Sequence, residues 1–410
     1  MGGVSMEWKE VTLGEVSSKI GDGLHGTPKY DDEGSYYFIN GNNLNCGKII
    51  IKDDTKRVGK DEFVKNQKEL NEQTILVSIN GTIGNVAKYN NELCILGKSA
   101  CYINVIKEVD KEFIYYVLTS ANFKRNITNE ATGTTIKNVS LKQMREYKFN
   151  IPCNISDQRR IASILSSLDR KIELNNKINA DLEEMAQAIF KNWFVDFEPF
   201  KDGKFVDSEL GMIPEGWKVG RLDEIADVVG GSTPSKAKPE YYTQKGIAWL
   251  TPKDLSNHPA VYTSRGVIDI TEEGYNSTST KLMPKGTILF TSRAPIGYIS
   301  IAQNDICTNQ GFKSLVPKKA GTCFLYCFLK YVTPEIENKS TGSTFKEASG
   351  SLMKSLQVIM PEQKVFEEFE EIVSPLFARI ESLEKESSRL SLLRDTLLPR
   401  LMSGELEVPE

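Results

Sequence analysis

The 410-residue sequence has little of what metal and thiol chemistry require. It holds two histidines, His25 and His258, and seven cysteines, no two of which form a C-x-x-C pair. A structural zinc site is therefore not expected, and the thiols are expected to be reduced. The sequence has no signal-peptide pattern and no run approaching about 18 apolar residues. We therefore expect a cytoplasmic protein that makes no membrane contact.

Signatures of catalysis are missing too. The sequence contains neither G-x-S-x-G nor H-E-x-x-H, so it shows no nucleophile elbow and no zinc-protease helix. Gly97-Lys98-Ser99 resembles the end of a phosphate-binding loop, but the first glycine that such a loop requires is replaced by Glu92. We therefore expect no catalytic residues, no metal and no cofactor in this chain.

An excess of positive charge is also lacking. The chain has 51 Lys and Arg against 55 Asp and Glu, a formal net charge of −4. Taken over the whole chain, this balance argues against a nucleic-acid partner. Residues 362–410 alone hold 12 acidic and 6 basic side chains, so the acidity lies mainly in this last segment. The rest of the chain is close to neutral and weakly basic.

The most informative feature is an internal repeat. Four blocks recur in the same order, displaced by 209 or 213 residues. A repeat of this length predicts two copies of one structural unit in tandem. The blocks are Glu7–Val16 with Gly216–Ile225, Thr74–Gly84 with Thr287–Gly297, Thr132–Lys137 with Thr341–Lys346, and Pro152 with Pro361.

Each copy begins with a globular part and ends with a long helix. Short apolar runs such as Thr74–Ser78 and Thr287–Thr291 lie between Gly, Asn, Asp and Pro turns, which is typical of strands. Helical patterns occur among them, for example over Lys111–Ser120 and Thr322–Tyr331. The predicted fold class is α+β, with two similar domains of mixed helix and strand.

The two long helices carry apolar residues spaced alternately by three and four, which is the pattern of a coiled-coil seam. Asn175 and Asn179 interrupt the first seam, and either fix its register or lie on a frayed, solvated face. Pro375 is expected to kink the second helix. The residues expected to pair the helices are Leu165, Leu168, Ile172, Leu182, Ile189, Val373, Leu376, Ile380, Leu383 and Leu390.

The order of these segments predicts the architecture. If the repeats are related by a pseudo-twofold axis, the helices form an antiparallel coiled coil that holds the two domains apart. The expected segments are a first globular domain at 1–152, a spacer helix at 153–194, a linker at 195–215, a second globular domain at 216–361, and a second helix at 362–404 followed by a tail to 410.

Loops of small, hydroxyl-bearing and basic residues recur in both domains. Such loops suit phosphate contacts through backbone N–H, hydroxyl and ammonium groups. Arg293 has the donors to read guanine and Asn80 those to read adenine. A hairpin turn with an exposed polar side chain is the more ordinary account of each residue. The candidate DNA contacts are Lys29, Asn80, Thr82, Lys98, Thr134, Thr135 and Lys137, and then Ser232, Thr233, Lys236, Lys238, Ser292, Arg293, Ser343, Thr344 and Lys346.

Several motifs together resemble one family over nearly the whole chain, the specificity subunits of type I restriction-modification enzymes. The first domain departs from the pattern, with His25-Gly26-Thr27-Pro28 in place of Gly-Ser-Thr-Pro. The motifs are the repeated Trp-Lys…Leu-x-Glu openings, Gly-Ser-Thr-Pro at 231–234, Thr-Ser-Arg-Ala-Pro-Ile-Gly at 291–297, Asn-Gln-Gly-Phe-Lys at 309–313, both Thr-Gly-[Ser/Thr]-Thr strings, and Asn-Trp-Phe-Val-Asp-Phe-Glu-Pro at 192–199.

The resemblance implies that each domain is a target-recognition domain for one half of a split target in double-stranded DNA, with the helices setting the gap. It adds Gln310 and Lys313 to the candidate DNA contacts. It also implies that the chain has no activity alone. Two modification subunits would use S-adenosylmethionine, and restriction subunits would use ATP and Mg²⁺.

Two other classes stay open on the residues alone. One is a tandem scaffold that binds protein or carbohydrate, with the coiled coil as an oligomer interface. The other is a free-standing hydrolase or transferase whose site has no familiar motif. DNA recognition predicts steep weakening of binding as salt rises, whereas the other two classes do not.

Overall fold

A computed structural model describes residues 6–131, 137–340 and 346–408. The chain divides into two compact units: unit 1 comprises residues 1–172 and 389–410, and unit 2 comprises residues 173–388. Each unit contains one globular head and part of each of two 40-residue helices, α5 (Ile155–Phe194) and α11 (Gln363–Met402). We call residues 6–152 head 1 and residues 216–361 head 2.

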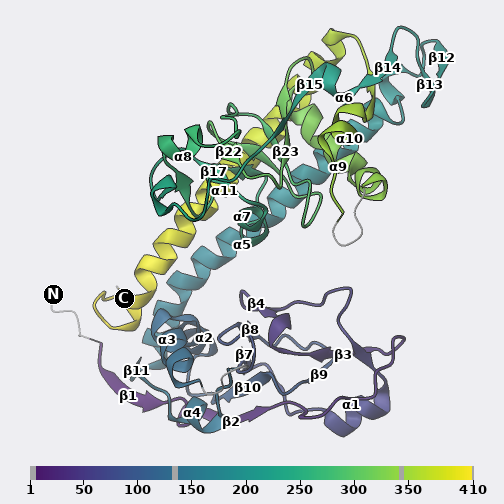
Figure 1. Cartoon of the computed structure of the whole chain (residues 1–410). Helices are drawn as coiled ribbons and strands as arrows, with labels where there is room; N and C mark the ends of the chain where they lie inside the picture. Colours follow the sequence, from purple (N-terminus) through teal and green to yellow (C-terminus); the bar gives the residue numbers. More distant parts are fainter. Residues whose placement is uncertain (1–5, 132–136, 341–345, 409–410) are drawn as a thin grey trace. The chain divides into compact units, whose positions relative to one another are not determined.

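Head 1 is built on an antiparallel sheet in the order β2-β10-β7-β8 (Figure 1). Its strands are β2 (Ser17–Asp22), β7 (Thr74–Ser78), β8 (Val86–Lys88) and β10 (Ala100–Val105). Successive side chains of β7 enter different cores, because side chains alternate across a strand. Ile75 and Val77 join the core beneath α2, whereas Leu76 joins a smaller core on the other face. Both faces are therefore buried, as the apolar sequence of β7 predicts.

The remaining elements of head 1 extend these two cores. A second sheet has the order β6-β3-β9, and two strand pairs, β1-β11 and β4-β5, complete it. The elements are β1 (Trp8–Thr12), β3 (Tyr36–Ile39), η1 (Gly41–Asn43), β4 (Leu44–Asn45), β5 (Lys48–Ile49), β6 (Arg57–Val58), α1 (Lys60–Asn66), β9 (Cys94–Leu96), α2 (Lys111–Thr119), α3 (Ala121–Glu130), α4 (Leu141–Glu146) and β11 (Lys148–Pro152).

Head 2 repeats this plan. Its main sheet has the order β15-β23-β20-β21-β18, with β15, β23, β20 and β21 in the places of β2, β10, β7 and β8. The strands are β15 (Ala226–Gly230), β18 (Tyr262–Thr263), β20 (Ile288–Phe290), β21 (Ile299–Ala302) and β23 (Lys313–Pro317). In β20 the alternation recurs, since Ile288 and Phe290 join one core and Leu289 joins another. The predicted tandem α+β architecture is confirmed.

Smaller elements surround the main sheet of unit 2. They are η2 (Glu198–Phe200), β12 (Phe205–Ser208), β13 (Gly211–Pro214), β14 (Lys218–Arg221), α6 (Leu222–Ile225), η3 (Pro239–Tyr241), β16 (Tyr242–Thr243), β17 (Trp249–Leu250), α7 (Pro252–Asn257), β19 (Asp269–Ile270), α8 (Glu272–Asn276), β22 (Cys307–Thr308), α9 (Thr322–Lys339), α10 (Gly350–Ser355) and β24 (Gln357–Met360).

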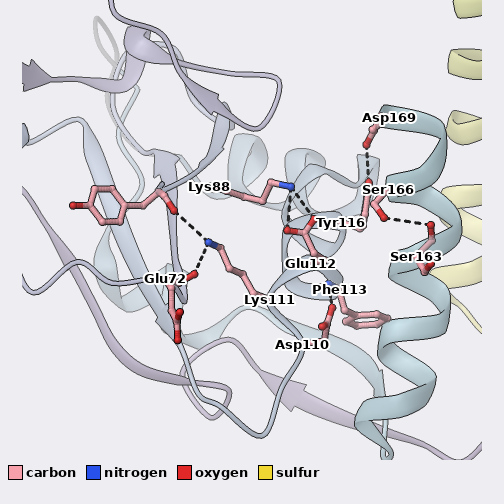
Figure 2. A network of polar contacts seen from close by, with 11 residues as sticks. Glu72, Lys88, Asp110, Lys111, Glu112, Phe113, Tyr116, Ser163, Ser166 and Asp169 are labelled. Carbon is pink, nitrogen blue, oxygen red and sulfur yellow. Dashed lines mark hydrogen bonds and ion pairs between the residues drawn. The ribbon is translucent and has the colours of Figure 1, made fainter. Parts of the chain in front are cut away.

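Polar contacts tie helix α2 both to the rest of head 1 and to α5 (Figure 2). The Lys111 ammonium donates to the Glu72 carbonyl at 2.6 Å, and Lys88 pairs with Glu112 at 2.8 Å. One turn further along α2, the Tyr116 hydroxyl donates to Asp169 of α5 at 2.7 Å. Asp169 is therefore one acceptor that joins the head to the helix in unit 1, and Gln158 of α5, which accepts from the N–H of Asp110 at 2.9 Å, is another.

The two long helices run antiparallel within each unit. In unit 1, Arg394 of α11 pairs with Asp169 of α5 at 2.7 Å. Nearer the start of α5, Leu165 shares a core with Leu401. The residue numbers therefore rise along one helix as they fall along the other. Of the ten residues expected to pair the helices, four are buried and six are partly buried: Leu165, Val373, Ile380 and Leu383, and then Leu168, Ile172, Leu182, Ile189, Leu376 and Leu390.

Unit 2 shows the same antiparallel pairing and places Asn175 inside the seam. Its amide donates to Glu386 at 2.9 Å and to Ser387 at 3.3 Å, and its side chain is fully buried. Asn175 therefore does not lie on a frayed, solvated face, and its role in fixing the register stays a prediction. Helix α11 continues through Pro375, and the kink expected there stays a prediction.

The seam pattern missed a set of aromatic residues in unit 2. Phe190, Phe194 and Phe377 are each no more than 4% exposed, although they lie outside the predicted seam. They are buried because α9 of head 2 packs against the helix pair as a third partner. Within the part of the chain that the structure describes, no helix is long and apolar enough to cross a membrane.

Candidate nucleic-acid interface

In head 2 a short loop after β20 is held by backbone bonds on both sides. We call residues 292–295 the central loop of head 2. Ser292 donates its N–H to the carbonyl of Gly311 at 2.7 Å, and its own carbonyl accepts from Ala348 at 2.9 Å. Three segments that are distant in the sequence therefore meet: the central loop, the turn before β23, and the segment before α10.

These segments bring charged side chains together. Arg293 lies 3.1 Å from one carboxylate oxygen of Glu347, and Lys313 lies 3.6 Å from the other. The side chains of Arg293 and Glu347 are 41% and 36% exposed, so solvent or a ligand can reach both. Lys313 is more enclosed, at 17%. The pairing of Arg293 with Glu347 could not be read from the sequence, because 54 residues separate them.

The glycine-rich loop before η3 joins the same surface of head 2. Ser232 donates its N–H to the carbonyl of Thr308 at 3.0 Å, and the hydroxyl of Thr233 hydrogen-bonds the side-chain oxygen of Gln310. A Cβ on Gly231 would lie 2.2 Å from the carbonyl oxygen of Thr308, so glycine is required for this approach. Four predicted contacts, Ser232, Thr233, Arg293 and Gln310, thus lie on neighbouring segments.

The same pattern of main-chain hydrogen bonds holds a loop in head 1, and we call this pattern the frame. We call residues 79–82 the central loop of head 1. Ile79 donates its N–H to the carbonyl of Ser99 at 3.0 Å, and its carbonyl accepts from Val139 at 2.9 Å. The side-chain amide of Asn80 donates to the side-chain oxygen of Asn138 at 3.2 Å. Asn80 occupies the position of Arg293, and Asn138 that of Glu347, at the offsets found in the repeat.

The other predicted contacts differ in how they are placed. Ser292 is fully buried and its hydroxyl donates to the Gly311 carbonyl, so it supports the central loop instead of facing outward. The Lys238 ammonium lies over the Tyr241 ring and bonds its hydroxyl, which raises the pKa of Lys238. Lys346 donates to the carbonyl of Glu337 at 3.3 Å. All three side chains make contacts within the protein, but Lys238 and Lys346 are exposed and can also reach a ligand.

The remaining predicted contacts are exposed or lie outside the described residues. Exposed side chains suit contact with a large ligand, but exposure alone does not assign one. The exposed ones are Lys29, Thr82, Lys98, Lys137 and Lys236. Those outside the described residues are Thr134, Thr135, Ser343 and Thr344.

A glycine motif in head 1 has the sequence spacing of a dinucleotide-binding loop but lacks the helix that such a site requires. Residues 21–26 have the spacing G-x-G-x-x-G. A dinucleotide site places a helix directly after these glycines. Here Leu24 instead bridges to Gly97, and the next helical element in the chain is η1. His25 contacts Asp22 at 2.7 Å, so this loop is closed by its own side chains.

The buried cysteines are poor nucleophiles. Burial raises the pKa of the Cys94 thiol to about 12 and that of Cys307 to about 11. It also raises the pKa of Cys101, Cys323 and Cys327. These thiols stay protonated at neutral pH, and only the thiolate is reactive. No group of His, Cys, Asp and Glu able to hold a metal ion occurs among the described residues.

Comparisons with known proteins agree with the duplicated frame. The model of the type I restriction modification DNA specificity domain matches residues 6–184 and again residues 214–391. The MjaIX specificity subunit of Methanocaldococcus jannaschii is 40% identical over 190 residues, 46% of this chain and 44% of that protein. This match thus spans less than half of that relative. The HindI specificity subunit of Haemophilus influenzae is 26% identical over 359 residues, 72% of this chain and 77% of that protein.

A solved structure shares the fold. The S subunit of a type I restriction-modification system from M. genitalium superposes with a TM-score of 0.58 at 21% identity. The superposition covers 98% of this chain and 97% of that one. Each matched segment begins at the start of one head or two residues before it, and continues into the helix that follows that head. The chain therefore belongs to the type I restriction modification DNA specificity domain family, and it carries the domain twice.

Proposed function

We propose that this chain is the DNA-recognition subunit of a type I restriction-modification complex, in which each head reads one half of a two-part target. The observation that carries this proposal is the central loop, which recurs in both heads in the same backbone frame with different side chains. A duplicated frame with unlike side chains suits two unlike half-sites, because base edges are distinguished by the donors and acceptors that meet them.

The long helices have the dimensions of a spacer. A helix of 40 residues is about 60 Å long at 1.5 Å per residue, which corresponds to roughly 18 base pairs of DNA. Antiparallel pairing with Asn175 in the seam fixes the register of one helix against the other. We propose that the helix pair sets the gap between the half-sites and docks two modification subunits.

The chemistry of the complex is assigned to other subunits. The chain itself is proposed to be non-catalytic and to hold no cofactor. The modification subunits would bind S-adenosylmethionine, and the restriction subunits would bind ATP and Mg²⁺.

The heads need these partners for tight binding to DNA. Non-specific affinity grows with the number of phosphates that Lys and Arg neutralise, and the whole chain has a net charge of −4. In the proposed interface Glu347 already pairs with Arg293 and Lys313. We therefore propose that the chain gives the complex its sequence preference, while the partner subunits add much of its affinity.

The helix-spacer proposal is tested by lengthening both helices together. Seven residues inserted between Asp169 and Asn175 of α5, with seven inserted between Ser387 and Arg394 of α11, keep the heptad pattern. The added rise is about 10 Å, or about three base pairs. A methylation map made with the modification subunits should show the same two half-sites with a longer gap. A change in the bases recognised in either half-site would refute the spacer role.

A control insertion distinguishes an effect of helix length from a general effect of inserting residues. Seven residues added between Ser208 and Gly211, in the turn of the β12–β13 hairpin, leave both helices unchanged. This variant should give the wild-type map with the wild-type gap. If it changed the gap as well, the helix pair would not be the element that sets the spacing.

A further inference from the structure

The central loops of the two heads differ at one pair of matched positions. In head 2 the pair is Arg293 with Glu347, at 3.1 Å. In head 1 it is Asn80 with Asn138, at 3.2 Å. Arg293 and Asn80 directly follow Ser292 and Ile79, whose main-chain N–H and carbonyl groups are both hydrogen-bonded. Glu347 and Asn138 directly precede Ala348 and Val139, whose N–H groups donate to those carbonyls.

The frame fixes the backbone of both members of each pair. The carbonyls of Ser292 and Ile79 accept from Ala348 and Val139 at the same distance, 2.9 Å. Because these bonds use only main-chain atoms, the neighbouring side chains can be exchanged without altering the frame. The charge of the side chains beside the loop can therefore differ between the heads. Lys313 adds a third charged group in head 2, whereas the corresponding residue of head 1 is the buried Cys101.

The two pairs suit different bases. A guanidinium matches the two acceptors O6 and N7 of guanine, and a carboxamide matches N6 and N7 of adenine. Either side chain must be held in one orientation to discriminate, since a freely rotating donor also satisfies phosphate oxygens. Glu347 restrains the guanidinium of Arg293, and Asn138 restrains the amide of Asn80. The restraint leaves each side chain partly exposed.

We propose that Glu347 and Asn138 are specificity-determining positioning residues, and that each orients the base-reading side chain of its own head. The identity of the pair, Arg293–Glu347 or Asn80–Asn138, sets the preferred base pair at one position of the corresponding half-site. This inference rests on the proposed function, because it requires that the heads read DNA.

The charge of Glu347 gives a second reason for this role. A carboxylate beside the DNA repels phosphate and so lowers affinity for every sequence alike. It also keeps Arg293 and Lys313 from acting as unselective phosphate ligands. A group that weakens all binding but restrains the reading side chain favours selectivity over affinity.

Exchange of the pairs between heads tests the proposal. The variants are Arg293→Asn with Glu347→Asn, which gives head 2 the pair of head 1, and Asn80→Arg with Asn138→Glu, which does the reverse. Each is assembled as the full chain with its modification subunits and used to methylate a plasmid library with randomised bases. We expect each exchange to change the preference at one position of one half-site by roughly tenfold or more, with the other half-site unaltered.

Glu347→Gln separates positioning from a structural role, and it preserves the shape of the residue if an exchange variant does not fold. The lost charge should raise binding to a non-target duplex and lower discrimination at the same single position by about five- to tenfold. A merely structural residue would lower methylation at all sites without changing any base preference. Glu335→Gln is the matched control, because Glu335 pairs with Lys339 on the exposed side of α9.

The outcomes distinguish this inference from the proposed function. If the wild-type complex methylates DNA without sequence preference, the proposed function fails. If the wild-type complex gives a two-part motif while Glu347→Gln and both exchanges leave every base preference unchanged, the pair proposal alone is overturned. A change at one position of the corresponding half-site supports it.

Discussion

The two heads share the main-chain hydrogen bonds around the central loop, but the side chains at matched positions of that loop differ. Main-chain bonds fix the central loop in both, whereas the side chains there are charged in head 2 and uncharged amides in head 1. In the proposed interface, support and recognition are therefore carried by separate atoms. A fold with this separation can change the base it reads with little effect on its stability.

The heads also differ in how they contact the long helices. In unit 1 the contact includes a polar chain from Tyr116 through Asp169 to Arg394. In unit 2 it includes a cluster of rings, with Phe324 of α9 in contact with Phe190 and Phe194 of α5. The Tyr326 hydroxyl of α9 also donates to Glu183 of α5 at 3.1 Å. Ring packing depends on shape and burial, while the polar chain depends on each partner being present. Substitutions should therefore affect the two units differently.

The largest effect is expected from Phe324→Ala. Phe324 is 1% exposed, and burial of this kind is worth about 3–5 kcal/mol on truncation, with a further contribution from its ring partners. Phe113→Ala in the corresponding position of α2 is the matched change, in a core that is mostly aliphatic. Urea unfolding should show the larger loss for Phe324→Ala. Equal losses would remove the distinction between the two contacts.

A pH dependence of stability is expected in unit 2. Glu384 of α11 accepts N–H bonds from Val261 and Tyr262, which lower its pKa. Burial, together with the nearby carboxylates of Glu183 and Glu381, outweighs these bonds and raises the pKa to about 7. The folded state therefore holds the proton more tightly than the unfolded state, whose value is near 4.5. The contribution to stability is full below about pH 4.5 and is lost as pH rises through 7.

The size of this effect is about 2–3 kcal/mol between pH 4.5 and 8. Urea unfolding at several pH values measures it. Glu384→Gln cannot ionise, so it should flatten this part of the profile. A slope that stayed the same in Glu384→Gln would show that other groups cause the dependence.

The polar chain of unit 1 predicts a smaller loss. Asp169→Ala leaves the Tyr116 hydroxyl without its acceptor and removes one carboxylate from Arg394, at a cost of about 1–3 kcal/mol. Asp169→Asn keeps an acceptor and should cost less. Thermal unfolding of the two variants gives the comparison. If both matched the wild type, this chain of contacts would not stabilise unit 1.

The smallest effect concerns phosphate contacts at matched positions of the heads. Lys137→Ala and Lys346→Ala should each weaken binding of the assembled complex to all duplexes alike, and lower the salt slope by about one. Lys364→Ala, on the exposed start of α11, is the control. Titrations at several salt concentrations measure the slope. A loss confined to one base pair would instead mean that the lysine reads a base.

The sequence predicted the local and repeated features better than the long-range ones. Three–four spacing identified both long helices, and short apolar runs between turns identified β7 and β20, because these patterns arise from neighbouring residues. The partners of Arg293 and Asn80 were missed. Each lies more than 50 residues away, and nothing in the local pattern marks Glu347 or Asn138.

The buried side chains show a similar division. The seam pattern selected residues on one face of each helix but omitted Phe190 and Phe377, which are buried by α9 as a third partner. Ser292 was predicted as an exposed contact because its loop is polar. Its burial follows from a bond to Gly311 that only the folded chain creates. Which residues touch DNA stays a prediction.

The most direct test of the central claim is the methylation map of DNA modified by the wild-type chain together with its modification subunits. Two heads with the same frame and different side chains predict a motif of two unlike half-sites separated by a gap of fixed length. A single continuous motif, or methylation without sequence preference, would contradict the account.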